Sequence, residues 1–271
     1  MNKPLVLFTA PIATRSGYGS HARDLLHSLI KTDKYDIKVS SINWGDCPMN
    51  VLDQNNPKDM LIIDRILRTN ELERQPDIHI QVTVPNEFQP IGKYNIGITA
   101  GIETTKVAPK WLQLGNEMDK ILVVSNHAKT SYETTVATAT NNQTGESAPY
   151  KLETPIEVVH ETTPRTKPEE IPELKLDYDF NFLTVAQWGP RKNMKNTIRW
   201  FVEEFFDQEV GLVIKTNHAK NCTMDRFLVQ SKLEQVLSKY DNSKRKCKIH
   251  LLHGIMSDEE ISSLYVHPKI K

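Results

Sequence analysis

The first strand-to-helix segment of the chain reads LVLFTAPIATRSGYGSHARDLLHSLI over residues 5–30. The apolar run 5–8 predicts a β-strand, and the glycine-containing stretch 15–19 predicts a turn after it. Helix-spaced apolar residues then predict an amphipathic helix with one apolar stripe formed by Tyr18, Ala22, Leu25, Leu26 and Leu29. A strand, a short turn and an amphipathic helix in this order are typical of a parallel α/β sheet.

The same alternation continues through the first half of the chain. Further strands are predicted at 37–42, 78–84, 95–99, 121–124 and 156–159, and helices at 60–72, 109–116 and 126–136. Ser125 stands where the last of these helices needs an N-cap residue. The stretch 138–147 is rich in Thr, Asn, Gln and Gly and predicts a surface loop or a disordered insert.

The pattern restarts after a segment rich in proline and charge, which indicates a linker between two domains. Strands are predicted at 182–186, 212–215 and 249–252, with a helix capped by Asn193, a helix over 223–240 and a helix opened by a capping box at 257–260. We therefore predict one domain over 1–163, a linker over 164–177 and a second domain over 178–271. Doubly wound domains usually have five or six strands, so the second domain is predicted to be incomplete.

The composition excludes several classes of protein. The 271 residues include 34 Lys+Arg and 34 Asp+Glu, so there is no basic excess for binding nucleic acid. The apolar run at the N-terminus is too short for a signal peptide or a transmembrane segment. The 3 cysteines form no CxxC motif, which argues against a disulfide framework or a zinc site and indicates a cytoplasmic protein.

Two strand-to-helix turns are candidates for binding phosphate. Gly17, Tyr18 and Gly19 lie in the first, where backbone N–H groups and a helix N-terminus can approach an anion. This turn lacks the GxGxxG fingerprint, and a simple tight turn is the alternative. The second contains Arg191 and Lys192, whose cations are expected beside a helix N-terminus; the alternative is a solvated basic turn.

Other polar residues follow predicted strands. Lys215 ends one, and a lysine there faces the ligand crevice of a parallel sheet unless it is simply an exposed strand end. Glu103 follows another, where a carboxylate can hold sugar hydroxyls or accept a proton; an ordinary loop glutamate is the alternative. The pair Asp177 and Asp179 has the spacing of a DxD metal motif, but a polar lead-in to a strand explains it better.

Taken in order, these segments resemble the retaining, nucleotide-sugar-dependent glycosyltransferases of the GT-B fold, in the group that includes the group 1 and family 4-like transferases. The stretch 97–104, with Trp111, Asn116, Asp119 and the run 123–129, carries the resemblance in the first domain. In the second domain it rests on 182–205, 212–216 and 249–265.

The resemblance implies two Rossmann-like domains and transfer of a sugar from a nucleotide-diphosphate sugar, with retention and without a metal or cofactor. It makes Glu103 and Lys192 the catalytic candidates. The donor diphosphate would be held by Gly17, Tyr18, Gly19, Arg191, Lys192 and Lys215, and the remaining cleft candidates are Ser125, His160, Glu161 and Gln187. The family usually has an arginine where this chain has Gln187, and its glutamate-rich donor motif has no counterpart before residue 271.

Several alternatives remain open at this point. The chain could be an inactive fragment, or one half of a split enzyme whose missing C-terminal half comes from a partner chain. It could also be another Rossmann-type nucleotide-binding enzyme, or a metal-dependent transferase that uses Asp177 and Asp179. The sequence names neither the donor nor the acceptor, which could be a sugar, a lipid or a protein.

Overall fold

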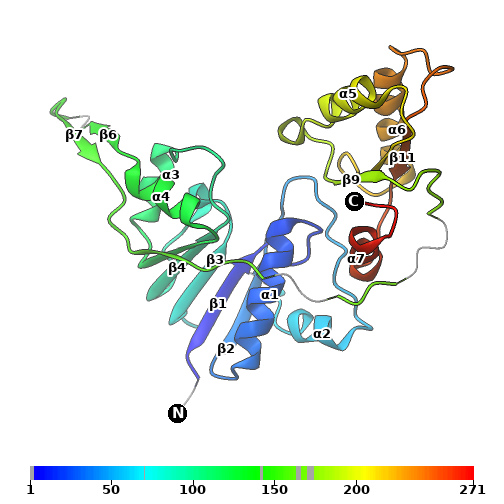
Figure 1. Ribbon diagram of the computed structural model, residues 1–271. Coiled ribbons are helices and arrows are strands. Elements are labelled where there is room, and N and C mark those ends of the chain that lie inside the picture. Colours follow the sequence, from blue (N-terminus) through cyan, green and yellow to red (C-terminus); the bar gives the residue numbers. More distant parts are fainter. Residues whose placement is uncertain (1–2, 70, 141–142, 163–165, 170–173) are drawn as a thin grey trace. The chain divides into compact units, whose positions relative to one another are not determined.

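The computed structural model describes residues 3–69, 71–140, 143–162, 166–169 and 174–271, and its chain divides into two compact units, Met1–Thr162 and Thr163–Lys271 (Figure 1). Of the predicted linker, residues 164, 165 and 170–173 lie outside the described part. Leu176, near the end of the predicted linker, is buried with Val213 and Leu264 in a core of the second unit.

The first unit is built on a parallel sheet with the strand order β2-β1-β3-β4-β5-β8. Its strands are β1 (Leu5–Ala10), β2 (Asp36–Ser41), β3 (Ile78–Val82), β4 (Tyr94–Thr99), β5 (Lys120–Val123) and β8 (Ile156–Val158). Ile66 adds a single parallel bridge to Val39 on the free side of β2. With that bridge the order matches that of a doubly wound Rossmann-type sheet.

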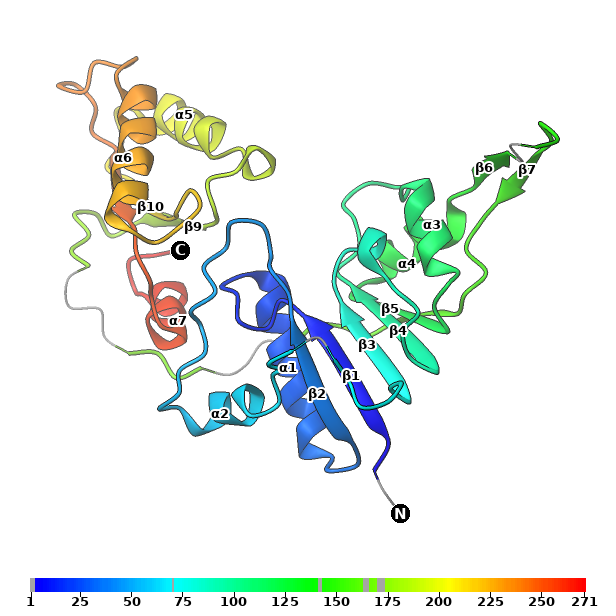
Figure 2. The ribbon, with the colours of Figure 1, turned by 180° about the vertical axis from the view of Figure 1, so that it is seen from behind.

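The two faces of this sheet are covered by different helices. Alternate residues of β1, such as Val6 and Phe8, pack against Ala22 and Leu26 of α1 (Gly17–Lys31). On the other face α3 (Pro109–Gly115) and α4 (Asn126–Thr134) form a second core with β5 and β8. Helix α1 lies in front of β1 and β2 in Figure 1 and behind them in Figure 2, which is turned by 180°.

The helix predicted over 60–72 is wrong in its extent. Helix α2 is Pro57–Ile63, with Pro57 in its first turn and Asn56 accepting a hydrogen bond from the N–H of Lys58. The following residues pair with β2, because the N–H of Val39 donates to Arg65 O and the N–H of Leu67 donates to Val39 O. Strand pairing therefore replaces the helical hydrogen bonds that the apolar spacing suggested.

The polar stretch 138–147 is also different from the prediction. Strands β6 (Ala137–Thr140) and β7 (Ser147–Tyr150) pair antiparallel, so the described part of this stretch belongs to a β-hairpin rather than a loop; residues 141–142 lie outside the described part. Figure 1 shows the hairpin extending away from α3 and α4. Threonine is β-branched and favours extended backbone, which the polar composition concealed.

The second unit contains a parallel sheet with the order β11-β10-β9, formed by β9 (Asn181–Val185), β10 (Gly211–Lys215) and β11 (Lys248–Leu252). These are the three strands that the sequence predicts. Helices α5 (Met194–Phe205) and α6 (Thr223–Leu237) share one core with the sheet, while α7 (Asp258–Val266) contributes to another. Ser257 opens α7 with the predicted capping box, and Ile270 makes a parallel bridge to Asn181 on the outer side of β9.

Gly97 of β4 packs closely against Phe88, in the segment between β3 and β4. A Cβ atom on Gly97 would lie 2.4 Å from Cε2 of Phe88, whose side chain is buried. Gly97→Ala is therefore expected to destabilise the first unit by about 1–3 kcal/mol through overpacking. Urea unfolding followed by circular dichroism measures this change.

Gly17→Ala is the matched control, since a Cβ atom there meets nothing within 4 Å and the position is the first of α1. Its free energy of unfolding should equal or slightly exceed that of the unmodified chain. Equal stability of the two variants would contradict the close contact between Gly97 and Phe88.

Candidate functional site

In each unit the strands are parallel, so the turns that follow them gather at the carboxyl edge of the sheet. Ligand sites of open α/β sheets lie at this edge. The predicted site residues belong to one such edge in each unit, and we describe the two edges separately.

At the edge of the first unit, the glycine turn is organised by Ser16. Its hydroxyl accepts a hydrogen bond from the N–H of Gly19 at 3.0 Å and lies 2.8 Å from the Oγ1 of Thr14. A Cβ atom on Gly19 would lie 2.5 Å from the carbonyl oxygen of Thr14, so only glycine fits there. The Ser16 side chain thus caps α1 by accepting from the N–H of Gly19, while Gly17 is exposed at the start of that helix.

Tyr18 connects this turn to the end of β4 through hydrogen bonds. Its phenol oxygen lies 2.9 Å from Oγ1 of Thr99 and accepts a hydrogen bond from the N–H of Ala100 at 3.0 Å. Its ring stacks on Trp44 with centroids 4.2 Å apart. Burial raises the pKa of Tyr18, and the nearby carboxylates of Glu161 and Glu103 raise it further, against the hydrogen bonds that lower it. The phenol therefore stays protonated at neutral pH.

The other candidates of the first unit lie along the same edge. Glu103 is exposed, and Glu161 lies 3.7 Å from Nδ1 of His21 on α1. His160 donates from Nδ1 to Val124 O at 2.9 Å, which holds its ring beside the end of β5. Ser125 caps α4 by accepting from the N–H of Ala128 at 3.1 Å, as predicted. The structure thus gives Ser125 and His160 local structural contacts, and it places Glu103 at an exposed position.

At the edge of the second unit, the turn after β9 carries the predicted cations. Pro190–Lys192 form a single 3-10 turn, and Arg191 and Lys192 are both exposed. Among the described residues, the side-chain ammonium of Lys192 has no hydrogen-bond or ion-pair partner. Its charge is therefore available at the start of α5.

The predicted side-chain cap at Asn193 is wrong. Asn193 occupies the N-cap position in the left-handed region with φ 51°, and its side chain caps no helical N–H. Its Oδ1 instead accepts from the Nδ2 of Asn196 at 2.8 Å. Asparagine tolerates left-handed backbone better than other non-glycine residues, which explains why it is found between the 3-10 turn and α5.

Lys215 does not point freely into a crevice. Its ammonium group donates to Gly254 O at 2.7 Å, and the side chain is half-buried at the end of β10. Burial lowers the pKa of Lys215. Gln187 is also engaged, because its Nε2 donates to His218 O at 2.7 Å. Both side chains hold together loops that follow neighbouring strands.

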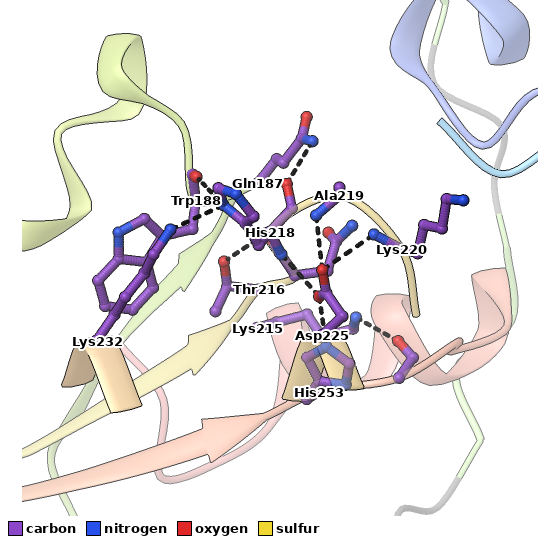
Figure 3. Close-up of polar contacts among 12 residues, drawn as sticks. Gln187, Trp188, Lys215, Thr216, His218, Ala219, Lys220, Asp225, Lys232 and His253 are labelled. Atoms are coloured by element: carbon purple, nitrogen blue, oxygen red, sulfur yellow. Dashed lines mark hydrogen bonds and ion pairs between the residues drawn. The ribbon is translucent and has the colours of Figure 1, made fainter. Parts of the chain in front are cut away.

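Sequence reasoning missed the residue that organises this edge, Asp225 in the first turn of α6 (Figure 3). One carboxylate oxygen accepts from the N–H of His218 at 2.8 Å and from Nε2 of His253 at 2.8 Å. The other accepts from the N–H groups of Ala219 and Lys220 at 2.8 and 3.1 Å. The Asp225 side chain is only 6% exposed and that of His253 only 4%.

Burial alone would raise the pKa of Asp225, but the hydrogen bonds from His253 and the three backbone N–H groups outweigh it and lower the pKa to about 2. His253 lies just beyond the end of β11. An aspartate at the third position of a helix that follows a strand and a short loop is the sequence signal that could have identified Asp225.

His218 connects two further elements to this loop. Its Nδ1 lies 2.9 Å from Nζ of Lys232 on α6 and 3.2 Å from Trp188 O. A single nitrogen cannot accept from the ammonium and donate to the carbonyl at once, so the tautomer of His218 selects one of these contacts. Trp188 is also joined to this loop through its backbone N–H, which donates to Asn217 O at 2.7 Å.

The two carboxylates of the DxD spacing are paired with lysines. Asp177 lies 2.9 Å from Nζ of Lys248, and Asp179 lies 3.2 Å from Nζ of Lys269. In the part of the chain that the structure describes, His, Cys, Asp and Glu form no group of three or more that could hold a metal ion. Within the same residues, no helix has the length and apolar character needed to cross a membrane.

Comparison with known proteins gives a match in structure but not in sequence. No protein-family model and no curated protein sequence matches the chain. The apo structure of OtsA superimposes with a TM-score of 0.53 at 10% identity, covering 97% of this chain and 76% of OtsA. A structure from E. coli, described as trehalose-6-phosphate bound with UDP-2-fluoro glucose, gives 0.52 at 10% identity over 96% of this chain and 76% of its own. This likeness shows the fold predicted from the sequence, two Rossmann-like units of the GT-B type.

The contacts of Asp225 lead to a prediction on stability. Its pKa is about 2 in the folded chain and about 4 when unfolded, so its ionised form adds about 2–3 kcal/mol of stability above pH 4. That contribution is lost as the pH falls from about 4 to about 2. Asp225→Asn should therefore destabilise the second unit at pH 7 and make its unfolding free energy less dependent on pH in this interval.

Chemical unfolding at a series of pH values measures both effects. Asp241→Asn is the control, because Asp241 is an exposed carboxylate bonded only to its local turn. A loss of stability for Asp225→Asn no greater than for Asp241→Asn would show that the buried network does not stabilise the unit.

Proposed function

We propose that the chain is a glycosyltransferase that moves a sugar from a nucleotide-diphosphate sugar to an acceptor, with retention of configuration and without a metal. The observation that carries this proposal is the exposed ammonium of Lys192 at the carboxyl edge of the second sheet, next to the start of α5, with no partner in the part of the chain that the structure describes. The GT-B fold and the sugar nucleotide bound to one structural neighbour support it by analogy.

The chemistry requires positive charge where the leaving diphosphate gains negative charge. Lys192 and Arg191 lie in one exposed turn, and the N-terminus of α5 adds the partial positive charge of its unpaired N–H groups. Preorganised positive groups of this kind stabilise the transition state more than the ground state. We assign these two side chains to the donor diphosphate, and they occupy the role that a divalent cation has in metal-dependent transferases.

Lys215 would take part indirectly in the proposed site. Its ammonium is bonded to Gly254 O, so in this conformation it fixes the loop after β11 rather than offering all its donors to a ligand. Gln187 follows β9, where the family that the sequence resembles usually has an arginine. Its side chain is bonded to His218 O. The proposed site therefore depends on Lys192 and Arg191 more strongly than a site with the full set of cations.

In the first unit, Glu103 is the residue proposed to hold the acceptor. It is exposed after β4, and its carboxylate is one of the groups that raise the pKa of Tyr18. In retaining transfer the leaving phosphate assists removal of the acceptor proton, so Glu103 would orient an acceptor hydroxyl. Gly17, whose surroundings leave open space, is proposed as a backbone contact to phosphate in the first unit.

Lys192→Ala is expected to weaken binding of UDP, GDP or ADP sugars by roughly 10- to 100-fold, as expected for loss of one charge-assisted contact to phosphate. Isothermal titration with these donors measures the effect. Lys239→Ala, which removes an exposed lysine just after α6, should bind as the unmodified chain does. Equal affinities for Lys192→Ala and Lys239→Ala would remove Lys192 from the proposed site.

Metal independence has its own test. Release of nucleoside diphosphate from the donor should proceed at an unchanged rate after treatment with EDTA, because cationic side chains rather than a metal neutralise the diphosphate. Asp177→Asn combined with Asp179→Asn should leave that rate unaltered as well. Loss of turnover on chelation, restored by Mg²⁺ or Mn²⁺, would favour the alternative in which this aspartate pair holds a metal.

A further inference from the structure

The first unit contains a cavity of about 830 Å³ on the sheet face opposite α1, and the proposed function makes no use of it. Its volume falls within the range of small-molecule sites, about 300–1,000 Å³. All the residues that line it belong to the first unit; they are Leu7, Thr9, Ser40, Ser41, Ile42, Leu67, Leu72, Arg74, Gln75, Pro76, His79, Gln81, Thr83, Glu87, Gln89 and Ile91.

The cavity exists because of how the chain crosses this face. After the bridge at Ile66, the chain passes from the outer edge of β2 to β3, on the far side of β1. In doubly wound folds such a crossover usually carries a helix. Here the described residues of the connection, 67–69 and 71–77, form no helix, and some of them make one wall of the cavity. Figure 2 shows this face of β1 and β2, with α1 behind it.

The floor of the cavity is polar, which is unusual for a parallel sheet. Ser40, Thr9 and Gln81 stand side by side on β2, β1 and β3 in the strand register. His79 lies in the neighbouring row, and His79 and Gln81 are only 1% and 2% exposed. Strands buried on both faces of a parallel sheet are normally almost continuously apolar.

Hydrogen bonds hold the floor in a fixed arrangement. Nδ1 of His79 donates to Gln89 O at 3.2 Å, so its Nε2 accepts from the Thr9 hydroxyl at 2.9 Å. Gln81 bonds to both the N–H and the carbonyl of Gln89 at 2.9 Å. These bonds fix the loop before β4 as the second wall. The buried Ser41 hydroxyl, by contrast, has no partner among the described residues.

The charges around the cavity disfavour ionic ligands. The lining residues with formal charges are Arg74 and Glu87, and Arg74 is paired with Asp77 at 2.8 Å. Glu87 accepts a hydrogen bond from Thr83 at 2.6 Å and would repel an anion. Burial lowers the pKa of His79 to about 4, so its imidazole is neutral at physiological pH. Hydroxyl, amide and imidazole groups therefore face aliphatic walls that include Leu7, Leu67 and Ile91.

We propose that this cavity binds an uncharged, hydroxyl-rich small molecule, of the size of a mono- or disaccharide. The hydroxyl groups of Thr9 and Ser40, both half-buried, can exchange hydrogen bonds with sugar hydroxyls, and the aliphatic walls can cover the C–H faces of a sugar ring. Ser40 stands in the polar row of the floor and is only half-buried, so its hydroxyl can donate to and accept from such a ligand. The site is separate from the proposed donor site and stands whether or not the chain transfers sugars.

The test uses the full chain labelled with ¹⁵N and four neutral disaccharides: maltose, cellobiose, lactose and trehalose. Each is titrated to about 20 mM, which detects dissociation constants in the millimolar range. At least one should cause saturable amide shifts centred on Thr9, Ser41 and Gln81. Absence of saturable shifts with all four, or saturable shifts only elsewhere, would overturn the proposal.

A blocking variant and a control locate the site independently. Ser40→Trp puts an indole group into the cavity and should reduce the affinity at least tenfold, whereas Ser28→Trp, on the exposed side of α1, should keep it. Undiminished binding by a folded Ser40→Trp chain would also overturn the proposal. If that variant fails to fold, the amide shifts of the unmodified chain are sufficient to test the proposal.

Discussion

Parallel strand pairing is the constraint on which the rest of this structure depends. In the two larger sheets, each connection must carry the chain back to the edge where the strands begin. All the strands therefore end at the opposite, carboxyl edge, and the turns that follow them lie side by side there. That geometry brings Tyr18 to the end of β4 in the first unit. In the second unit it brings the loops after β9, β10 and β11 within hydrogen-bonding distance of one another.

The two carboxyl edges use different side chains to satisfy the backbone N–H groups of their turns. In the first unit, a serine cap and a tyrosine phenol satisfy the backbone groups of the turn. In the second, the buried Asp225 carboxylate collects three backbone N–H groups and one imidazole. A buried charge is costly unless its hydrogen bonds are satisfied, so this network fixes the loop after β10 in one position. The turn that contains Arg191 and Lys192 is joined to this loop through Trp188.

Much of the fold could be predicted from the sequence because strand and helix periods are local signals. The strands of both sheets were identified in this way, and so were the caps at Ser125 and Ser257. The failures came where a distant partner decides the local structure. Ile66 leaves the helical pattern because Val39 pairs with it, and the threonines of β6 become a strand because β7 lies opposite. The turn that contains Lys192 was predicted between a strand and a helix, whereas Asp225 was missed because its hydrogen-bond donors come from two separate loops.

The central claim is that a nucleotide diphosphate binds at the turn between β9 and α5. A crystal structure of the chain with UDP, GDP or ADP bound tests it most directly. The account predicts the diphosphate beside Pro190–Lys192, with Nζ of Lys192 within about 3 Å of a phosphate oxygen. A diphosphate bound elsewhere on the chain, with Lys192 left in solvent, would contradict it.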